Sequence, residues 1–227
     1  MLELMALGKE IPAGLNTALL FQASPEQTLV PVDRAKPTRK ITRWDNPAGV
    51  VSGGPVTSDY SFQCNLGGYQ LAPDDKPDLV FMPGQDFTVE WFAKHGNFLN
   101  GCYLIAFDAL STRSALYRDG TAMVLTDSAG SEARFIYGTT FPLNVWHHIA
   151  IVGKDNVMTL YIDGIARISL QDWSGFSTPQ STAVIMGRGG AVNSGGRSYC
   201  QMDQFRISKV ARYDRDFTPT TVPFVLD

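Results

Sequence analysis

Carboxylates are the first residues to consider for chemistry in this chain, because a pair of them could act as acid and nucleophile. Two acids about 5–5.5 Å apart, as on one face of a strand, can cleave a glycosidic bond with retention. The 227-residue chain has only five glutamates, and no two of them lie within four residues of each other. The alternate positions on either side of Glu90 are Thr88 and Phe92, so its strand face carries no neighbouring acid. The sequence therefore predicts a protein that is not an enzyme, although an acid pair across two strands stays open.

Two adjacent histidines are the next candidates for chemistry. His147 and His148 lie in a run with strand character. Neighbouring residues of a strand point to opposite faces of the sheet, so these two side chains cannot bind one metal ion. We expect one of them to be packed and the other to be exposed at an edge. No His/Cys spacing is typical of a zinc site, and no Ser-His-Asp or Cys-His arrangement has a known local signature.

Calcium is the one cofactor that the sequence leaves open. Asp74, Asp75 and Asp78 form an acidic loop. Calcium takes six to eight oxygen ligands, and no segment has the dense acidic pattern of an EF-hand. We expect no cofactor, with calcium at an unspecified site as the alternative. Other oxygen-bearing side chains flank predicted turns: Asp108, Asp127, Asp155 and Asn156.

A glycine-rich segment, residues 188–197, is a candidate contact loop. It lacks the Lys-Ser/Thr ending of a phosphate-binding loop and follows no strand–helix pattern. It is therefore predicted to connect two strands. Loops on a rigid scaffold often carry contacts, and Arg188, Asn193 and Arg197 are the candidate contact residues of this one.

Charge and hydropathy exclude two classes of partner. The net charge is −3, and no basic run exceeds the pair Arg39-Lys40, so no nucleic-acid footprint is expected. No stretch approaches the roughly 20 apolar residues of a membrane span. The first ten residues lack the positive charge and the apolar run of a signal peptide. We expect synthesis in the cytoplasm and no membrane insertion.

From Phe87 onward the pattern is that of an all-β protein. Aromatic and β-branched runs alternate with glycine and Asp-Gly turn signals, and Trp146 is expected to bury its ring beside Ile149 and Ile151. Short strands at this spacing predict a sandwich or barrel. The predicted strands are Phe87–Lys94, Cys102–Phe107, Ser114–Tyr117, Thr121–Leu125, Ala133–Tyr137, Val145–Val152, Val157–Ile162, Ile165–Leu170, Ala183–Met186 and Tyr199–Ile207.

Residues 1–58 differ in composition, because they hold six of the 13 prolines. Proline lacks the donor that a central strand needs, so this part is predicted to be an extended N-terminal docking arm and linker. A partly disordered tail is the alternative. The predicted division is the arm at 1–58, a β-sandwich at 59–217 and an extended tail at 218–227. The apolar residues that the arm would bury against a partner are Leu19, Leu20, Phe21, Leu29, Val30 and Trp44.

Several segments resemble the laminin-G-like, concanavalin-A-like jelly-roll family. The resemblance covers roughly residues 59–227 and implies an antiparallel β-sandwich. First and last strands are often neighbours in this kind of sandwich, so Cys64 and Cys200 are expected to come near each other. An odd count of three cysteines still argues for thiols rather than a disulfide framework. The matching segments are Asp86–Lys94, Asn144–Val152, Met158–Gly164, Ile185–Gly187 and Met202–Ser208.

The end of the chain resembles a narrower group, the laminin-G-like domains of tailed-phage structural proteins. Phe205–Pro219 is similar to their closing segment, Thr221–Asp227 continues it, and Leu71–Phe81 is similar to the segment before their opening strand. This resemblance implies a non-catalytic virion protein: a capsid decoration, a head or tail fibre, or a neck component. Its partners would be other virion proteins and sister subunits of a homo-oligomer. The alternative is a carbohydrate-binding adhesion module that binds a host-surface glycan.

Overall fold

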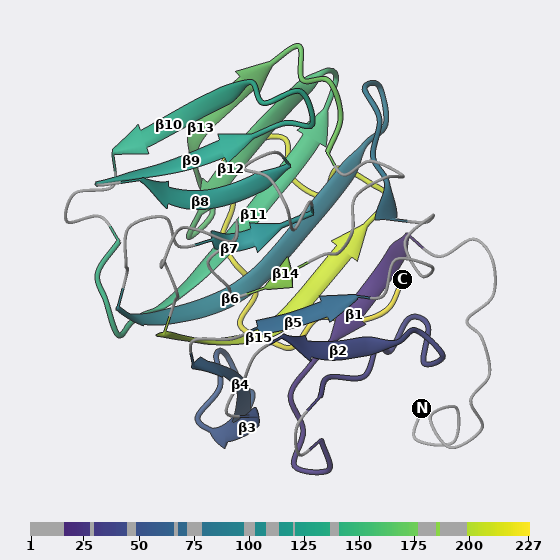
Figure 1. The fold of residues 1–227 in the computed structure, drawn as a ribbon, viewed down its shortest axis with the longest axis vertical. Coiled ribbons are helices and arrows are strands. Elements are labelled where there is room, and N and C mark those ends of the chain that lie inside the picture. Colours follow the sequence, from purple (N-terminus) through teal and green to yellow (C-terminus); the bar gives the residue numbers. More distant parts are fainter. Residues whose placement is uncertain are drawn as a thin grey trace.

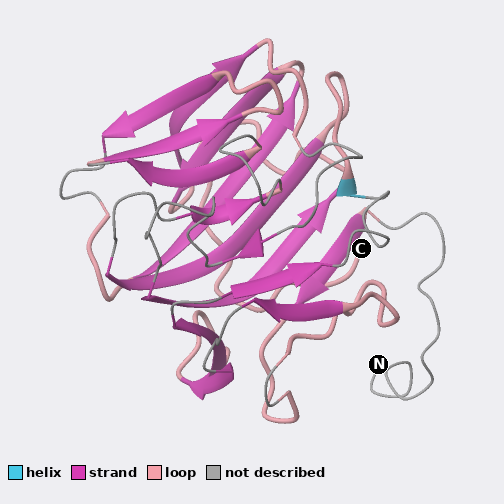
Figure 2. Ribbon diagram, in the orientation of Figure 1, coloured by secondary structure: helices cyan, strands magenta, loops and turns pink. Residues whose placement is uncertain are grey.

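Two antiparallel β-sheets stacked face to face make up the fold (Figure 1), and strands with their connecting loops account for almost all of it (Figure 2). The predicted β-sandwich is confirmed. The computed structural model describes residues 16–27, 30–44, 49–65, 68–71, 79–97, 103–107, 114–119, 121–136, 141–176, 185–186 and 199–227.

Sheet A has eight strands in the order β13-β12-β11-β6-β15-β4-β3, with β1 also paired to β15. β4 and β1 lie one after the other along the same side of β15, because β4 pairs with its first half and β1 with its second half. The strands are β1 (Thr17–Phe21), β3 (Gly49–Ser52), β4 (Tyr60–Asn65), β6 (Phe87–Asn97), β11 (Trp146–Lys154), β12 (Val157–Ile162), β13 (Ile165–Gln171) and β15 (Tyr199–Ser208).

Sheet B has seven strands in the order β10-β9-β8-β7-β14-β5-β2. No helix within the described part of the chain has the length and apolar character needed to cross a membrane. The strands are β2 (Ile41–Trp44), β5 (Gly68–Leu71), β7 (Tyr103–Ala106), β8 (Ala115–Asp119), β9 (Ala122–Thr126), β10 (Glu132–Ile136) and β14 (Ile185–Met186).

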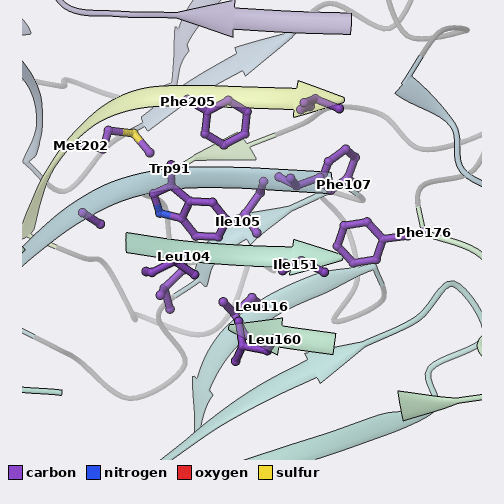
Figure 3. Close-up of a cluster of buried hydrophobic side chains, with 14 of the residues drawn as sticks. Trp91, Leu104, Ile105, Phe107, Leu116, Ile151, Leu160, Phe176, Met202 and Phe205 are labelled. Carbon is purple, nitrogen blue, oxygen red and sulfur yellow. The ribbon is translucent and has the colours of Figure 1, made fainter. Parts of the chain in front are cut away.

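The core lies between the sheets and follows from the two-residue period of the strands. On β6, Val89 and Trp91 point inward and are buried, and Trp91 lies against Phe205 of β15 in the centre of the cluster in Figure 3. The intervening residues of β6, Glu90 and Phe92, therefore face outward from sheet A. They are buried as well, so other parts of the chain cover this outer face.

The N-terminal part of the chain differs from the predicted arm. Residues Leu19, Leu20 and Phe21 belong to β1 and are buried, with Leu19 and Phe21 in the main core. These three side chains are not available to dock on another molecule. Residues 17–21 contain no proline and can therefore pair with β15, while Pro25, Pro31 and Pro37 fall in the loops that follow.

A buried ion pair fixes the next loop on the free edge of β1. Asp33 Oδ1 accepts the backbone N–H of Leu20 at 3.0 Å, and Arg39 donates to the Ala18 carbonyl at 2.9 Å and to Asp33 Oδ2. The backbone N–H of Arg34 also donates to the Leu20 carbonyl at 2.7 Å. An open strand edge invites pairing with another chain, and this loop blocks it.

Candidate functional site

The last residues of the chain cover the outer face of sheet A as a C-terminal strap, residues 209–227. Residues 218–227 are predicted to form an extended tail outside the sandwich, but the strap is hydrogen-bonded to the sandwich at both of its ends and at points between them. The Thr88 hydroxyl donates to the Val210 carbonyl at 2.8 Å and accepts the Arg212 N–H at 3.0 Å. Further along, the Phe224 N–H donates to Gln204 Oε1 at 2.8 Å. Phe224 is buried, so the strap is part of the folded unit.

The strap ends beside β1 (Figure 1), where Asp227 is held by three groups. Its carboxylate accepts hydrogen bonds from the Thr17 hydroxyl at 2.6 Å and from both terminal nitrogens of Arg212, at 2.6 and 3.0 Å. The Thr17 N–H also donates to the Asp227 carbonyl at 3.1 Å. The hydrogen bond from Arg212, followed by that from Thr17, outweighs partial burial and lowers the pKa of Asp227 to about 2.

Acid is therefore expected to loosen the end of the strap. The pKa of Asp227 is about 2 when folded, against an ordinary value of 3.8. A carboxyl group whose pKa is lower in the folded state stabilises it above the unfolded pKa and loses this effect as pH falls through the folded pKa. Asp227→Asn should melt below the wild type at pH 6, and this gap should close between about pH 4 and pH 2. Melting curves across this range check it; a gap that stays constant would contradict the role of Asp227.

A buried cluster of polar and charged side chains around Glu90 lies under the middle of the strap. Glu90 Oε1 accepts hydrogen bonds from Arg206 Nε at 2.9 Å and Nη2 at 2.7 Å. Glu90 Oε2 lies 3.2 Å from His148 Nε2 and accepts the Tyr213 hydroxyl at 2.8 Å. Burial alone would raise the pKa of Glu90, but the hydrogen bond from His148 and the charge of Arg206 lower it. Burial and Glu90 together raise the pKa of Tyr213, which keeps its hydroxyl protonated as a donor.

The strap closes this cluster off from solvent. The side chains of Glu90 and His148 are 0% and 1% exposed, and Arg206 stacks over the Phe224 ring of the strap at 4.2 Å. A substrate bond cannot reach an acid that has no exposed surface. The Glu90 carboxylate attaches the strap to the sheet through the hydrogen bond from Tyr213 and through an ion pair with Arg212 Nε at 3.6 Å.

The two adjacent histidines point to opposite faces, as predicted, but both are buried. His148 lies under the strap on the outer face, and His147 lies at the end of the interior. There its ring stacks on Phe141, with Nδ1 2.7 Å from Asp163 Oδ2 and Nε2 3.1 Å from the Pro142 carbonyl. The expectation of one edge-exposed histidine is wrong, because the strap covers His148 and neighbouring turns cover His147.

An aromatic platform, made of Tyr161, Tyr213 and Phe217, lies where the strap crosses β11 and β12. The Tyr213 and Phe217 rings stack with centroids 3.5 Å apart and planes 4° from parallel. Tyr161 of β12 lies beneath them, 5.5 Å from Phe217 and 6.3 Å from Tyr213. Tyr213 and Phe217 remain half-buried, whereas Tyr161 is buried.

Glycine at position 164 allows the strap to come this close. The Phe217 N–H donates to the Gly164 carbonyl at 2.9 Å. A Cβ atom at Gly164 would lie only 1.9 Å from the Phe217 carbonyl oxygen, and its φ of +77° disfavours other residues as well. The glycine of the predicted Asp-Gly turn therefore also allows the backbone at Phe217, and with it the platform, to pack against this turn.

Polar side chains lie on part of the sheet and strap around the aromatic platform. The exposed carboxylates of Asp214 and Asp216 lie close enough to Tyr161 to help burial raise its pKa. Asp214 accepts from Lys154 at 3.4 Å, and Asp216 accepts the Ala166 N–H at 2.9 Å. Thr159 lies two residues before Tyr161 on the same face of β12, and its hydroxyl lies 3.0 Å from that of Ser169 on β13 in an exposed part of the sheet.

Calcium gains no support among the described residues. The structure brings no group of three or more histidine, cysteine or acidic side chains there into a metal-binding arrangement. Asp127 is occupied by backbone: Oδ1 accepts the N–H groups of Ala129, Gly130 and Ser131 at 2.8–3.0 Å, and Oδ2 accepts the N–H and hydroxyl of Ser174. The acidic loop at 74–78 and Asp108 lie outside the described residues.

The predicted contact loop and part of the predicted docking arm stay untested. Arg188, Asn193, Arg197 and Leu29 lie outside the described residues. Val30 is half-buried, and Trp44 occupies the last position of β2 opposite Gly68. Sequence reasoning missed the platform because its rings come from distant positions; Tyr213 and Phe217, inside the segment similar to phage proteins, were the available signal.

The fold and the sequence together place the chain in a known family. Residues 66–222 match the Laminin_G_3 family model, described as the concanavalin A-like lectin/glucanases superfamily. The match covers more than half of the chain, and the chain belongs to this superfamily. A search of curated proteins finds no match.

Solved structures with a similar fold include binding domains of bacterial toxins. The binding domain of Paraclostridial Mosquitocidal Protein 1 has a TM-score of 0.65 and 16% identity, over 87% of this chain and 50% of that one. The Botulinum neurotoxin serotype G binding domain has a TM-score of 0.63 and 12% identity, over 87% and 49%. The serotype D ligand binding domain, solved in complex with N-acetylneuraminic acid, has a TM-score of 0.59 and 14% identity, over 87% and 48%. The present chain spans about half the length of these domains, and at such identities they show the fold alone.

Proposed function

We propose that this chain is a non-catalytic glycan-binding module. The observation that carries the proposal is the aromatic platform, a half-buried stack of Tyr213 on Phe217 with hydroxyls and carboxylates around it. The platform rests on a sheet and is therefore rigid. Glu90, which accepts the Tyr213 hydroxyl, is buried and bonded to Arg206, which supports binding without hydrolysis by this acid.

Sugars suit this combination of groups. The C–H face of a pyranose ring packs on an aromatic ring, and its hydroxyls need hydrogen-bond partners around that contact. Asp214 and Asp216 can accept hydroxyl protons, and Thr159 with Ser169 can donate or accept. The superfamily includes lectins by name, and one similar toxin domain was solved with a sugar bound. Both support the proposal.

The platform is expected to be the site of contact, so a bulky side chain placed near it should weaken binding. Ser169 is exposed on β13, and Ser169→Arg adds a long side chain there without touching the core. Fluorescent wild-type protein and this variant would be applied to a printed panel of neutral and sialylated oligosaccharides. We expect the wild type to bind at least one pyranose glycan, and the variant to lose at least tenfold in affinity.

A matched control separates this site from a general surface effect. Thr42 is likewise exposed on a strand, but on sheet B, and Thr42→Arg should bind as the wild type does. No binding by the wild type to any printed glycan would overturn the proposed function. Equal binding by both variants would move the site away from the platform, and release of reducing ends would show an enzyme instead.

We also propose that the module is carried on the particle of a tailed phage, with other virion proteins as partners. The support is the similarity of Phe205–Pro219 to phage laminin-G-like domains, since this same segment forms part of β15 and supplies the strap with Tyr213 and Phe217. Purified particles should contain this chain after density-gradient centrifugation. Recovery only in the particle-free fraction would contradict this setting and leave glycan binding untouched.

A further inference from the structure

Two cysteines lie directly opposite each other in sheet A. In the ladder between β4 and β15, Cys64 is the cross-strand partner of Cys200. Both side chains point into the main core and are buried, at 0% and 5% exposure. The two thiols also hydrogen-bond to each other. The sequence-based expectation that they come near each other is confirmed.

Such a pair is within reach of a covalent bond. Directly opposite residues of an antiparallel ladder have Cα atoms roughly 4.5 or 5.5 Å apart, depending on whether the pair is hydrogen-bonded. Disulfides occur at Cα separations of about 4.4–6.8 Å, so either kind of pair qualifies. Cys64 is next to the last residue of β4, and Cys200 is the second residue of β15. Strand ends can shift to bring the sulfur atoms into bonding geometry.

We propose that Cys64 and Cys200 are a disulfide site that is oxidised when the protein leaves a reducing compartment. Both cysteines are reduced thiols in the protein as it is made in a cytoplasm. The oxidant is a small disulfide such as oxidised glutathione. One cysteine thiolate attacks it and releases one reduced thiol; the second cysteine then attacks the mixed disulfide and releases the other. One S–S bond forms in the protein, and two electrons and two protons pass to the reagent.

The folded core controls when this reaction takes place. The hydrogen bond with Cys200 and burial both raise the pKa of Cys64. The reactive thiolate is therefore scarce in the closed sheet. Exchange proceeds during folding, or when β4 opens from β15, and the product is then buried away from reductants.

The bond would strengthen a short attachment. β4 pairs with β15 through four residue pairs, and β3 at the edge of sheet A pairs only with β4. The β3–β4 hairpin thus depends on this ladder for its place in the sheet. A link between positions so far apart in sequence also removes much of the conformational freedom of the unfolded chain.

Refolding in a glutathione redox buffer tests the proposal. Cys102→Ser removes the third cysteine, and the unfolded, reduced variant is refolded with excess oxidised glutathione. We expect the two titratable thiols to disappear, a peptide map to show Cys64 joined to Cys200, and the melting temperature to rise by roughly 10 °C. Reductant should reverse this rise. The matched control, Cys64→Ala in the same background, should melt alike in both redox states.

Three results would overturn the proposal: refolded protein that keeps both thiols, glutathione attached separately to each cysteine, or the same thermal shift in the Cys64→Ala control. If Cys102→Ser fails to fold, the wild type is refolded and mapped in the same buffer. A bond between Cys64 and Cys200 then supports the proposal, and a bond from either of them to Cys102 contradicts it. None of these results depends on glycan binding.

Discussion

Glu90→Ala is expected to lower the free energy of unfolding by about 3–5 kcal/mol, because it breaks a buried ion pair by removing one partner. Arg206, with its side chain only 8% exposed, would keep its charge and lose two hydrogen bonds. The Tyr213 hydroxyl would lose its acceptor at the same time. Urea unfolding followed by tryptophan fluorescence measures the effect.

A second glutamate provides the control for this substitution. Glu132 also bonds an arginine, Arg134, at 2.9 Å, but both side chains are more than 40% exposed. Exposed pairs contribute about 0–1 kcal/mol, so Glu132→Ala should unfold near the wild-type midpoint. Equal midpoints for the two alanine variants would show that Glu90 is not part of a buried network. Glu90→Gln, which keeps the shape and removes the charge, should lie between Glu90→Ala and the wild type.

The strands that sequence could predict are those with clear turns and a strong strand composition. β11, β12 and β13 have aromatic or β-branched runs separated by turn residues such as Asp163-Gly164, and the structure has all three. A turn whose two central residues both have positive φ is most often formed by Asn, Asp or Gly. The boundaries of these strands are therefore encoded in the local sequence. The fold class followed from this local pattern and from the family resemblance.

β1 and the strap could not be predicted in the same way. β1 is buried on both faces, with Leu19 and Phe21 toward the core and Leu20 toward Phe224, so it has no alternation of apolar and polar residues. The strap lies extended over side chains of sheet A without forming a ladder, and no local period reveals that. β1 and the strap both depend on long-range partners that only the folded chain brings together. The platform depends in turn on the position of the strap.

The side chain of Trp146 is less buried than expected and lies on the other face of the sheet from Ile149, for a related reason. Its ring is half-buried on the outer face of sheet A, where it packs against the cluster of Leu20, Phe92 and Phe224 and lies 5.4 Å from Lys94 Nζ. Ile149, three positions away, points to the opposite face and into the core. Composition marks this segment as a strand, but it does not say which face the first residue takes.

Trp91→Ala is therefore expected to be the damaging tryptophan substitution, at a cost of about 3–5 kcal/mol in the free energy of unfolding. Trp91 is 1% exposed and lies among the largest side chains of the core (Figure 3). Truncation there leaves a cavity between the sheets that the packed neighbours can fill only in part. Trp146→Ala removes a ring that water already reaches, so we expect about 1–2 kcal/mol. Urea midpoints of the two variants compare the costs directly. A larger loss for Trp146→Ala would mean that the outward face of sheet A, with the strap on it, contributes more to stability than the core between the sheets.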